Sequence, residues 1–202
     1  MAEARIASGL HHPNVVAVWD CGLVDELPFQ VMELVDGADS AALLDRAGQI
    51  PVSAAIHMAA EVARGLAHVH AARGPSGRSL GLVHRDVSPS NVLVSWEGEV
   101  KLADFGIVYA REGAGVGTEA GVTKGKAAFM SPEQATAGQL DGRSDIFGLA
   151  CTLHTWLTGR SPLSEGEGMV GLLSGTPLVL DPGLPEHVSS TLACALGRDR
   201  AS

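Results

Sequence analysis

The clearest pattern in the chain is the three- and four-residue spacing of apolar positions that predicts amphipathic helices. One such stretch covers residues 53–72, with Ser53 placed as its N-cap. A second covers residues 143–158 and is stopped by Gly159 and Pro162. The expected buried stripe of the first helix consists of Ile56, Ala60, Ala63, Leu66, Ala67 and His70. That of the second consists of Ile146, Leu149, Ala150, Leu153 and Leu157.

Short runs of apolar and β-branched residues predict strands between and before these helices. Residues 15–19 and 28–34 are expected to pair across a turn at 20–26, and residues 92–95 and 100–102 across a turn at 96–99. The glycine-rich segments 73–81 and 109–125 are expected to be loops. Shorter helices are predicted at 3–10, from about Ser40, at 167–173 and at 188–196.

Composition narrows the class of protein. With 202 residues, of which 46% are hydrophobic, the chain can bury one sizeable core, as one domain or as one domain and a piece of another. The net charge of -9 argues against a general nucleic-acid or anionic-membrane binder. No apolar run is long enough to span a bilayer or to serve as a signal sequence, so we expect a cytoplasmic location.

The three cysteines are Cys21, Cys151 and Cys194. They are widely spaced, odd in number and without a C-x-x-C pair. This arrangement fits reduced, buried cytosolic thiols better than a disulfide framework or a zinc site.

Three short motifs follow one another along the chain. HRDVSPSN occupies residues 84–91, DFG occupies 104–106 and SPE occupies 131–133. The order of the motifs makes the match specific, and on these residues the chain resembles a bacterial-type serine/threonine protein kinase over nearly its whole length. The resemblance implies an α+β, protein-kinase-like fold. Residues 1–34 would be a partial small lobe, made of the family's helix C and its fourth and fifth strands, and residues 35–202 a mostly helical large lobe without its last helix.

Catalytic roles follow from the resemblance. Asp86 would accept the proton of a substrate hydroxyl, while Asn91 and Asp104 would each give an oxygen to Mg²⁺. The family transfers the γ-phosphate of ATP to protein hydroxyls, through a transition state that requires positioning and positive charge. Arg85 is expected to receive a phosphorylated activation segment. The candidate phosphate acceptors there are Thr118 and Thr123.

The resemblance also implies a set of residues that bind ATP. Glu3 would hold the family's ATP-binding lysine, Met32 would be the gatekeeper, and Asp39 would reach the ribose. Each has a simpler alternative: a solvated glutamate, a core methionine and a helix cap. The complete set is Glu3, Met32, Glu33, Val35, Asp39 and Leu93.

One departure from the family pattern concerns Ser88 and Lys126. Most serine/threonine kinases carry lysine at the first position and threonine at the second, so the two residue types look exchanged. Our hypothesis is that the Lys126 ammonium reaches Asp86 and the γ-phosphate, with Ser88 hydrogen-bonded nearby. The alternative is two independent losses that weaken catalysis.

The resemblance predicts two further structural roles. Asp145 would be a buried acid that accepts backbone N–H groups from the catalytic loop, although an Asp at a helix start can be a simple cap. The family's regulatory spine would consist of Ala7, Val18, His84 and Phe105.

The family's glycine-rich loop and its lysine have no counterpart before Glu3. We therefore expect the chain by itself to transfer phosphate poorly and to leave the strands at 15–19 and 28–34 with uncovered apolar surface. Three hypotheses follow: a piece of an active serine/threonine kinase, a non-catalytic interaction module, or a small-molecule phosphotransferase. The activation segment and SPE motif disfavour the third, and Pro89 with the SPEQA segment disfavours tyrosine specificity. The protein substrate is not identified by the sequence.

Overall fold

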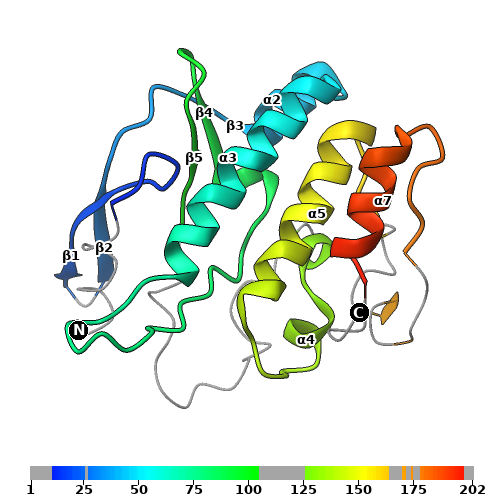
Figure 1. Cartoon of the computed structure of the whole chain (residues 1–202). Coiled ribbons are helices and arrows are strands. Elements are labelled where there is room, and N and C mark those ends of the chain that lie inside the picture. The colour runs from blue at the N-terminus through cyan, green and yellow to red at the C-terminus, as the bar shows by residue number, and fades with distance from the viewer. Residues whose placement is uncertain are drawn as a thin grey trace.

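The structure is a computed structural model that describes residues 11–25, 27–104, 126–163, 170–171, 174 and 178–197. Two helices, α3 (Val52–His70) and α5 (Gly142–Thr158), lie side by side at its centre (Figure 1). Helix α7 (Glu186–Ala195) packs on the far side of α5. The remaining short helices are α2 (Ser40–Ala47), α4 (Pro132–Ala135) and the 3-10 turns η1 (Pro89–Asn91) and η3 (Lys126–Phe129).

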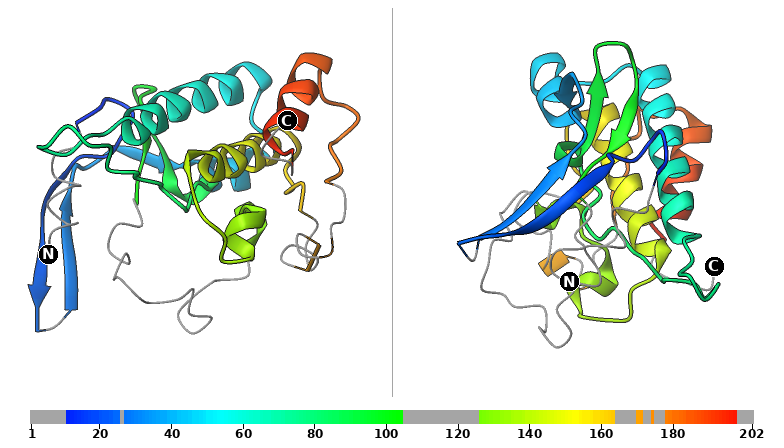
Figure 2. Two further views of the ribbon diagram at one scale, coloured as in Figure 1. Left: turned by 60° about the horizontal axis from the view of Figure 1, so that its bottom comes forward. Right: turned by 90° about the vertical axis from the view of Figure 1, so that its left-hand side faces the viewer.

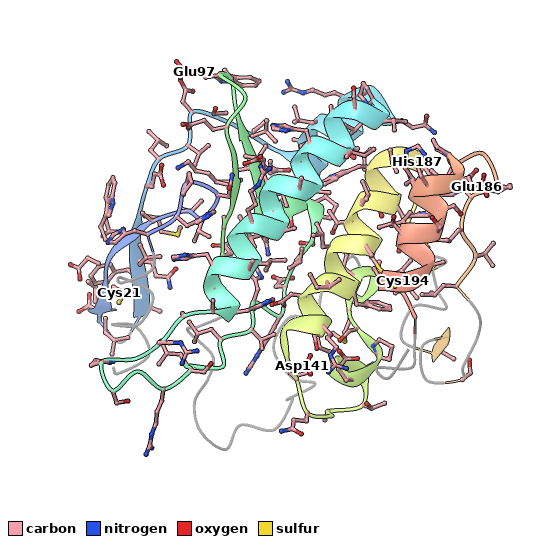
Figure 3. The ribbon with its side chains drawn as sticks, in the orientation of Figure 1. Cys21, Glu97, Asp141, Glu186, His187 and Cys194 are labelled. Atoms are coloured by element: carbon pink, nitrogen blue, oxygen red, sulfur yellow. The ribbon has the colours of Figure 1, made fainter. Side chains whose placement is uncertain are left out.

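A three-stranded antiparallel sheet lies beside α3. Its strand order is β3 (Gly37–Asp39), β4 (Val92–Ser95), β5 (Val100–Leu102). Glu97 marks the tip of the β4–β5 hairpin, which confirms the turn predicted at 96–99 (Figure 3). The segment before β1 runs along β5, since the Val16 amide donates to the Leu102 carbonyl at 2.9 Å. Four separate parts of the chain therefore meet at this sheet.

The second sheet is a hairpin of β1 (Val18–Val24) and β2 (Leu27–Met32) that projects away from the helices (Figure 2). The predicted turn at 20–26 is wrong, because β1 continues to Val24 and the chain reverses around Asp25. Backbone pairing satisfies the N–H and C=O groups here whatever the side chains, so polar and glycine residues do not end the strand. The exposed large side chains of the hairpin are Trp19, Leu23, Val24, Leu27, Phe29, Val31 and Met32, which confirms the expected uncovered apolar surface.

Helix α3 buries a different face from the one predicted. The side chains of Met58, Val62 and Val69 are buried, whereas Ile56 is 40% exposed and Ala60 is exposed. The many alanines of this helix fit either face, so the larger and β-branched residues decide which side turns inward. The buried residues are Ala55, Met58, Val62, Gly65, Leu66 and Val69.

The predicted cap of α3 is also wrong. The helix begins after Pro51, which has no side-chain hydrogen bond to the helix, and Ser53 already lies within the first turn. Asp39, in contrast, caps α2 through its carboxylate, which accepts from the Ala42 amide at 2.8 Å. The alternative reading of Asp39 as a helix cap is therefore confirmed.

Helix α5 is buried on most sides rather than along one stripe. Asp141 caps its start, and Gly159 ends it with a left-handed backbone (φ 75°), as predicted. Ile146, predicted to be in the stripe, is 39% exposed, while Phe147, Cys151 and Trp156 are buried. The helix sits between α3, α7 and η3, so an amphipathic pattern cannot describe it.

The three cysteines are thiols outside any disulfide, as predicted, but the expectation that they are buried is wrong for Cys194, which is exposed. Cys21 on β1 and Cys194 on α7 lie at opposite ends of the molecule (Figure 3). Cys151 is buried within α5, and burial raises the pKa of its thiol. Among the described residues, no helix combines the length and the apolar character that a membrane span requires.

Substitutions on α3 test which face is buried. Met58→Ala should lower the free energy of unfolding by about 2–5 kcal/mol, because it opens a cavity in the core. Ile56→Ala should cost less than about 1 kcal/mol, because that side chain is largely in solvent. Urea unfolding measures both, and the reverse order would contradict the observed face.

Candidate active site

The carboxylate of Asp145 organises the segment that carries HRD. It is 1% exposed and accepts three hydrogen bonds. The backbone amides of His84 and Arg85 donate to its two oxygens, each at 2.8 Å. His70 contributes the third bond from Nε2 at 2.7 Å, and because a carboxylate only accepts, Nε2 must carry the hydrogen. The structure thus places Asp145 where the sequence predicted it, as a buried acid and not merely a cap.

Two glycines of α5 allow this close packing. A Cβ at Gly142 would lie 2.6 Å from Nδ1 of His70, and one at Gly148 would lie 3.1 Å from the carbonyl oxygen of Val87. The first distance is a clash, and the second leaves almost no room. The absence of a side chain at these two positions therefore lets α5 pack closely against both α3 and the catalytic loop.

Asp86 and Asn91 are joined within one tight loop. The Asn91 side-chain nitrogen donates to the Asp86 carbonyl at 2.7 Å, and the Asn91 amide donates to the Ser88 carbonyl at 3.0 Å. Asn91 is 4% exposed. Because its amide nitrogen is committed to Asp86, the side-chain oxygen points along the other branch of the amide, and oxygen is the atom that Mg²⁺ takes.

The backbone before Asp104 is anchored to the same loop. The Ala103 amide donates to the Asn91 carbonyl at 2.8 Å, and the Ala103 carbonyl pairs with Nε2 of His84 at 2.9 Å. Asp104 itself is exposed and has a positive φ of 56°, a conformation that is strained for a residue with a Cβ. Asn91 and the residue before Asp104 are therefore held by hydrogen bonds to one frame.

This donor set fits magnesium. An amide oxygen and a carboxylate are hard oxygen ligands, and Mg²⁺ in nucleotide sites commonly takes one or two protein ligands with phosphates and waters completing the shell. No group of three or more His, Cys, Asp and Glu side chains in the described residues could hold a metal by itself.

Three residues expected at the ATP site meet at the sheet. Asp39 lies opposite Leu93, and Leu93 lies opposite Lys101. The Lys101 ammonium bonds the Glu33 carboxylate at 2.7 Å, which ties the segment after β2 to β5. Met32 ends β2 and is 37% exposed, and Val35 is half-buried. No local pattern predicts the Glu33–Lys101 pair, because its members lie far apart along the chain.

The environment of Glu33 favours its charged form. Burial alone would raise the pKa of its carboxyl, but hydrogen bonds from Lys101 and from the Ala17 amide outweigh burial and lower the pKa. The Glu33 amide also donates to the Ala17 carbonyl at 2.9 Å. The pair is part-buried, so it fixes the position of this segment.

A buried relay connects α5 to the turn η1. The Trp156 indole donates to the Ser40 hydroxyl at 2.9 Å, and that hydroxyl donates to the Pro89 carbonyl at 2.7 Å. Trp156 and Ser40 are both 0% exposed. Sequence reasoning did not single out either residue for this role.

The hypothesis that Ser88 and Lys126 have exchanged roles can be followed at Ser88 but not at Lys126. Ser88 is 2% exposed, and its hydroxyl pairs with the Ser90 hydroxyl at 3.1 Å. Lys126 begins η3, but its side chain lies outside the described part of the structure, so the exchange of roles stays a prediction. The other predicted residues outside the described ranges are Glu3, Ala7, Phe105, Thr118 and Thr123. Of the predicted spine, His84 and Val18 are buried.

The comparisons with known proteins agree with this geometry. A family model described as a protein kinase domain matches residues 1–174. The chain belongs to the protein kinase family. Members of this family in general use ATP and Mg²⁺.

Its relatives include bacterial kinases of more than one named specificity. The tyrosine-protein kinase MasK of Myxococcus xanthus is 37% identical over 204 residues, which cover 96% of this chain and 31% of MasK. The serine/threonine-protein kinase PknL of Mycobacterium tuberculosis is 38% identical over 207 residues, covering 98% of this chain and 49% of PknL. The chain therefore spans half or less of the length of these two relatives.

The fold agreement extends to a solved structure. The PknI kinase domain of Mycobacterium tuberculosis matches with a TM-score of 0.71 at 26% identity. The match covers 99% of this chain and 69% of the PknI chain. The predicted α+β, protein-kinase-like fold is confirmed.

The hydrogen bonds of His84 predict a pH dependence of stability. Its Nδ1 accepts from the Asp86 amide at 3.2 Å, which requires the neutral ring, and burial lowers its pKa below the ordinary 6.5 despite the nearby Asp145. Below pH 6.5 the unfolded state therefore binds more protons than the folded state, and stability should fall as pH falls, by at most about 1.4 kcal/mol per pH unit for this group. Urea unfolding at pH 7.5 and 5.5 should show a smaller pH effect in His84→Gln than in the parent. Equal pH effects would contradict this assignment.

Proposed function

We propose that this chain is the catalytic part of a kinase that transfers the γ-phosphate of ATP to serine or threonine hydroxyls of proteins. The observation that carries the proposal is the hydrogen-bonded frame around Asp145, which connects Asp86, Asn91 and the residue before Asp104. Such a frame suits phosphoryl transfer, because this reaction depends on positioning and charge more than on covalent help.

In this proposal Asp86 accepts the proton of the substrate hydroxyl as the oxygen attacks the γ-phosphate. Asn91 and Asp104 present oxygens to Mg²⁺, which offsets the negative charge of the phosphates when it is bound. The frame around Asp145 keeps the three groups in register, so that little reorganisation is required during the reaction.

Other residues take supporting parts. Arg85, on the exposed side of the loop, is suited to a phosphorylated activation segment, and Lys126 to the charge of the γ-phosphate, with Ser88 buried beneath the loop. The same proposal divides the chain into a partial small lobe at 1–34 and a large lobe at 35–202. It also includes a cytoplasmic location.

The nucleotide is assigned to the region formed by the end of β2, the segment that follows it, and the paired strands β3 and β4. Val35 and the backbone of Glu33 are proposed to face the adenine, with Met32 and Leu93 as its apolar contacts and Glu3 as a partner of the phosphate-binding group. Asp39 is proposed to reach the ribose with the oxygen that does not accept from Ala42. The Glu33–Lys101 pair supports this placement, since it fixes the segment that would carry the adenine contacts.

A second candidate function is a non-catalytic interaction module with the kinase fold. The observation that favours it is the apolar surface of the β1–β2 hairpin, where Leu27 is 71% exposed and Trp19 is 63% exposed. Apolar patches of this kind mark interaction surfaces. Magnesium-dependent binding of ATP separates the two candidates, because an interaction module does not require it.

Removing the proposed base tests the catalytic assignment. Asp86→Asn preserves the size of the side chain but cannot take the hydroxyl proton, so the rate of phosphate transfer that the chain sustains should fall about 100-fold or more. The measurement is magnesium-dependent transfer of labelled γ-phosphate to a serine- and threonine-containing protein substrate. Asp45→Asn, at an exposed aspartate on α2 outside the catalytic loop and the nucleotide-binding segment, is the matched control. A rate that does not change in Asp86→Asn would refute the proposed role of Asp86.

A further inference from the structure

Gln134 links two segments that the proposed reaction requires together. It lies in α4, directly after the SPE motif, in the segment 126–135. We call this segment the docking segment, because in the proposed function it would meet the protein substrate. The side-chain nitrogen of Gln134 donates to the carbonyl oxygen of Arg85 at 2.7 Å, across 49 residues of sequence. The bond therefore joins the docking segment directly to the catalytic loop.

The other half of the Gln134 amide is also engaged. Its side-chain oxygen accepts from the Ser131 amide at 3.0 Å, and the Ser131 hydroxyl accepts from the Gln134 amide, which together form a capping box. Ser131 is 0% exposed. One planar side chain thus holds the start of α4 with its oxygen and the catalytic loop with its nitrogen.

The peptide that Gln134 reaches is the one that leads into Asp86. This peptide group joins Arg85 to Asp86. The carbonyl oxygen of Arg85 accepts from Gln134, and the amide of Asp86 donates to Nδ1 of His84 at 3.2 Å. Arg85 has a positive φ of 70°, which a side chain with a Cβ adopts only when its surroundings hold it. The bond from Gln134 is one of the contacts that oppose rotation of this peptide.

We propose that Gln134 is a positioning residue that makes the orientation of the Asp86 peptide depend on the docking segment. When the docking segment is seated, Gln134 holds the Arg85 carbonyl and so fixes the backbone from which the Asp86 side chain extends. When the segment is displaced, the carbonyl loses this donor, and the strained Arg85 backbone is free to relax. The kinetic consequence rests on the proposed phosphate transfer, whereas the coupling itself does not.

The chain offers a substitution that separates the two bonds of Gln134. In Gln134→Glu one carboxylate oxygen can still accept from Ser131, and glutamate is as suitable as glutamine at this position of a capping box. The second oxygen, however, replaces the donor to Arg85 with an acceptor. The start of α4 should therefore survive, while the bond to the catalytic loop is lost. Gln139→Glu, at an exposed position beyond α4, is the control for the added charge.

The experiment measures amide hydrogen exchange of Asp86 by NMR in the full chain, together with the melting temperature. Because a neutral hydrogen bond contributes modestly to stability, we expect the Asp86 amide to exchange about tenfold faster in Gln134→Glu, with unchanged exchange in Gln139→Glu. The melting temperature should fall by only about 2–5 °C in Gln134→Glu, the shift that a tenfold change in the folding equilibrium produces, and should stay at the parent value in Gln139→Glu. In phosphate transfer, kcat should fall about tenfold in Gln134→Glu while the KM for ATP stays within about twofold.

The outcomes are distinguishable. Parent-like exchange at Asp86 in a folded Gln134→Glu variant would overturn the coupling, whatever the kinetics show. Faster exchange in Gln139→Glu as well would also overturn it, because the effect would then come from charge alone. If the exchange result is as expected but Asp86→Asn leaves the rate of phosphate transfer unchanged, the proposed function fails and the coupling of Gln134 to the Asp86 peptide stands.

Discussion

The structure depends on one buried carboxylate. Asp145 lies at the start of the most buried helix and accepts hydrogen bonds from two consecutive catalytic-loop amides and from His70 on α3. A buried charge is costly unless its oxygens are satisfied, and here three donors satisfy them. The cost of leaving the carboxylate without these partners forces the catalytic loop to pass close to α5. The need to satisfy this buried carboxylate therefore sets the position of the loop that carries Asp86 and Asn91.

The other contacts of the site extend this frame. The relay from Trp156 through Ser40 fixes the Pro89 carbonyl at the start of the turn that carries Asn91. The backbone of Ala103 is held on one side by Asn91 and on the other by His84. Glu33 and Lys101 join the segment after β2 to the sheet. Each link joins segments that are distant in sequence, so the site is rigid because several independent parts of the chain meet there.

The sequence indicated the positions of the proposed catalytic residues better than the contacts that support them. Two of the motifs located Asp86, Asn91 and Asp104, because each motif is local and the order of the motifs along the chain is specific. Asp145 lies in none of the motifs and was implied by the resemblance of the helix at 143–158. The buried face of α3 was missed because its alanines suit either side, and β1 was predicted too short because backbone pairing outweighed its polar residues. Contacts such as Trp156–Ser40, across 116 residues, follow only from the tertiary fold. Gln134 did leave a local signal, the S-x-x-Q spacing of a capping box, but its bond to Arg85 did not.

The most direct test of this account is amide hydrogen exchange at His84 and Arg85 in Asp145→Asn, with the amides of α3 as an internal reference. Asparagine offers one acceptor oxygen and one NH₂ group in place of two oxygens. The two loop amides therefore cannot both keep an acceptor. The account predicts that at least one of these two amides loses about tenfold or more of its protection while α3 remains protected. Unchanged protection at both amides would contradict the claim that Asp145 holds the catalytic loop.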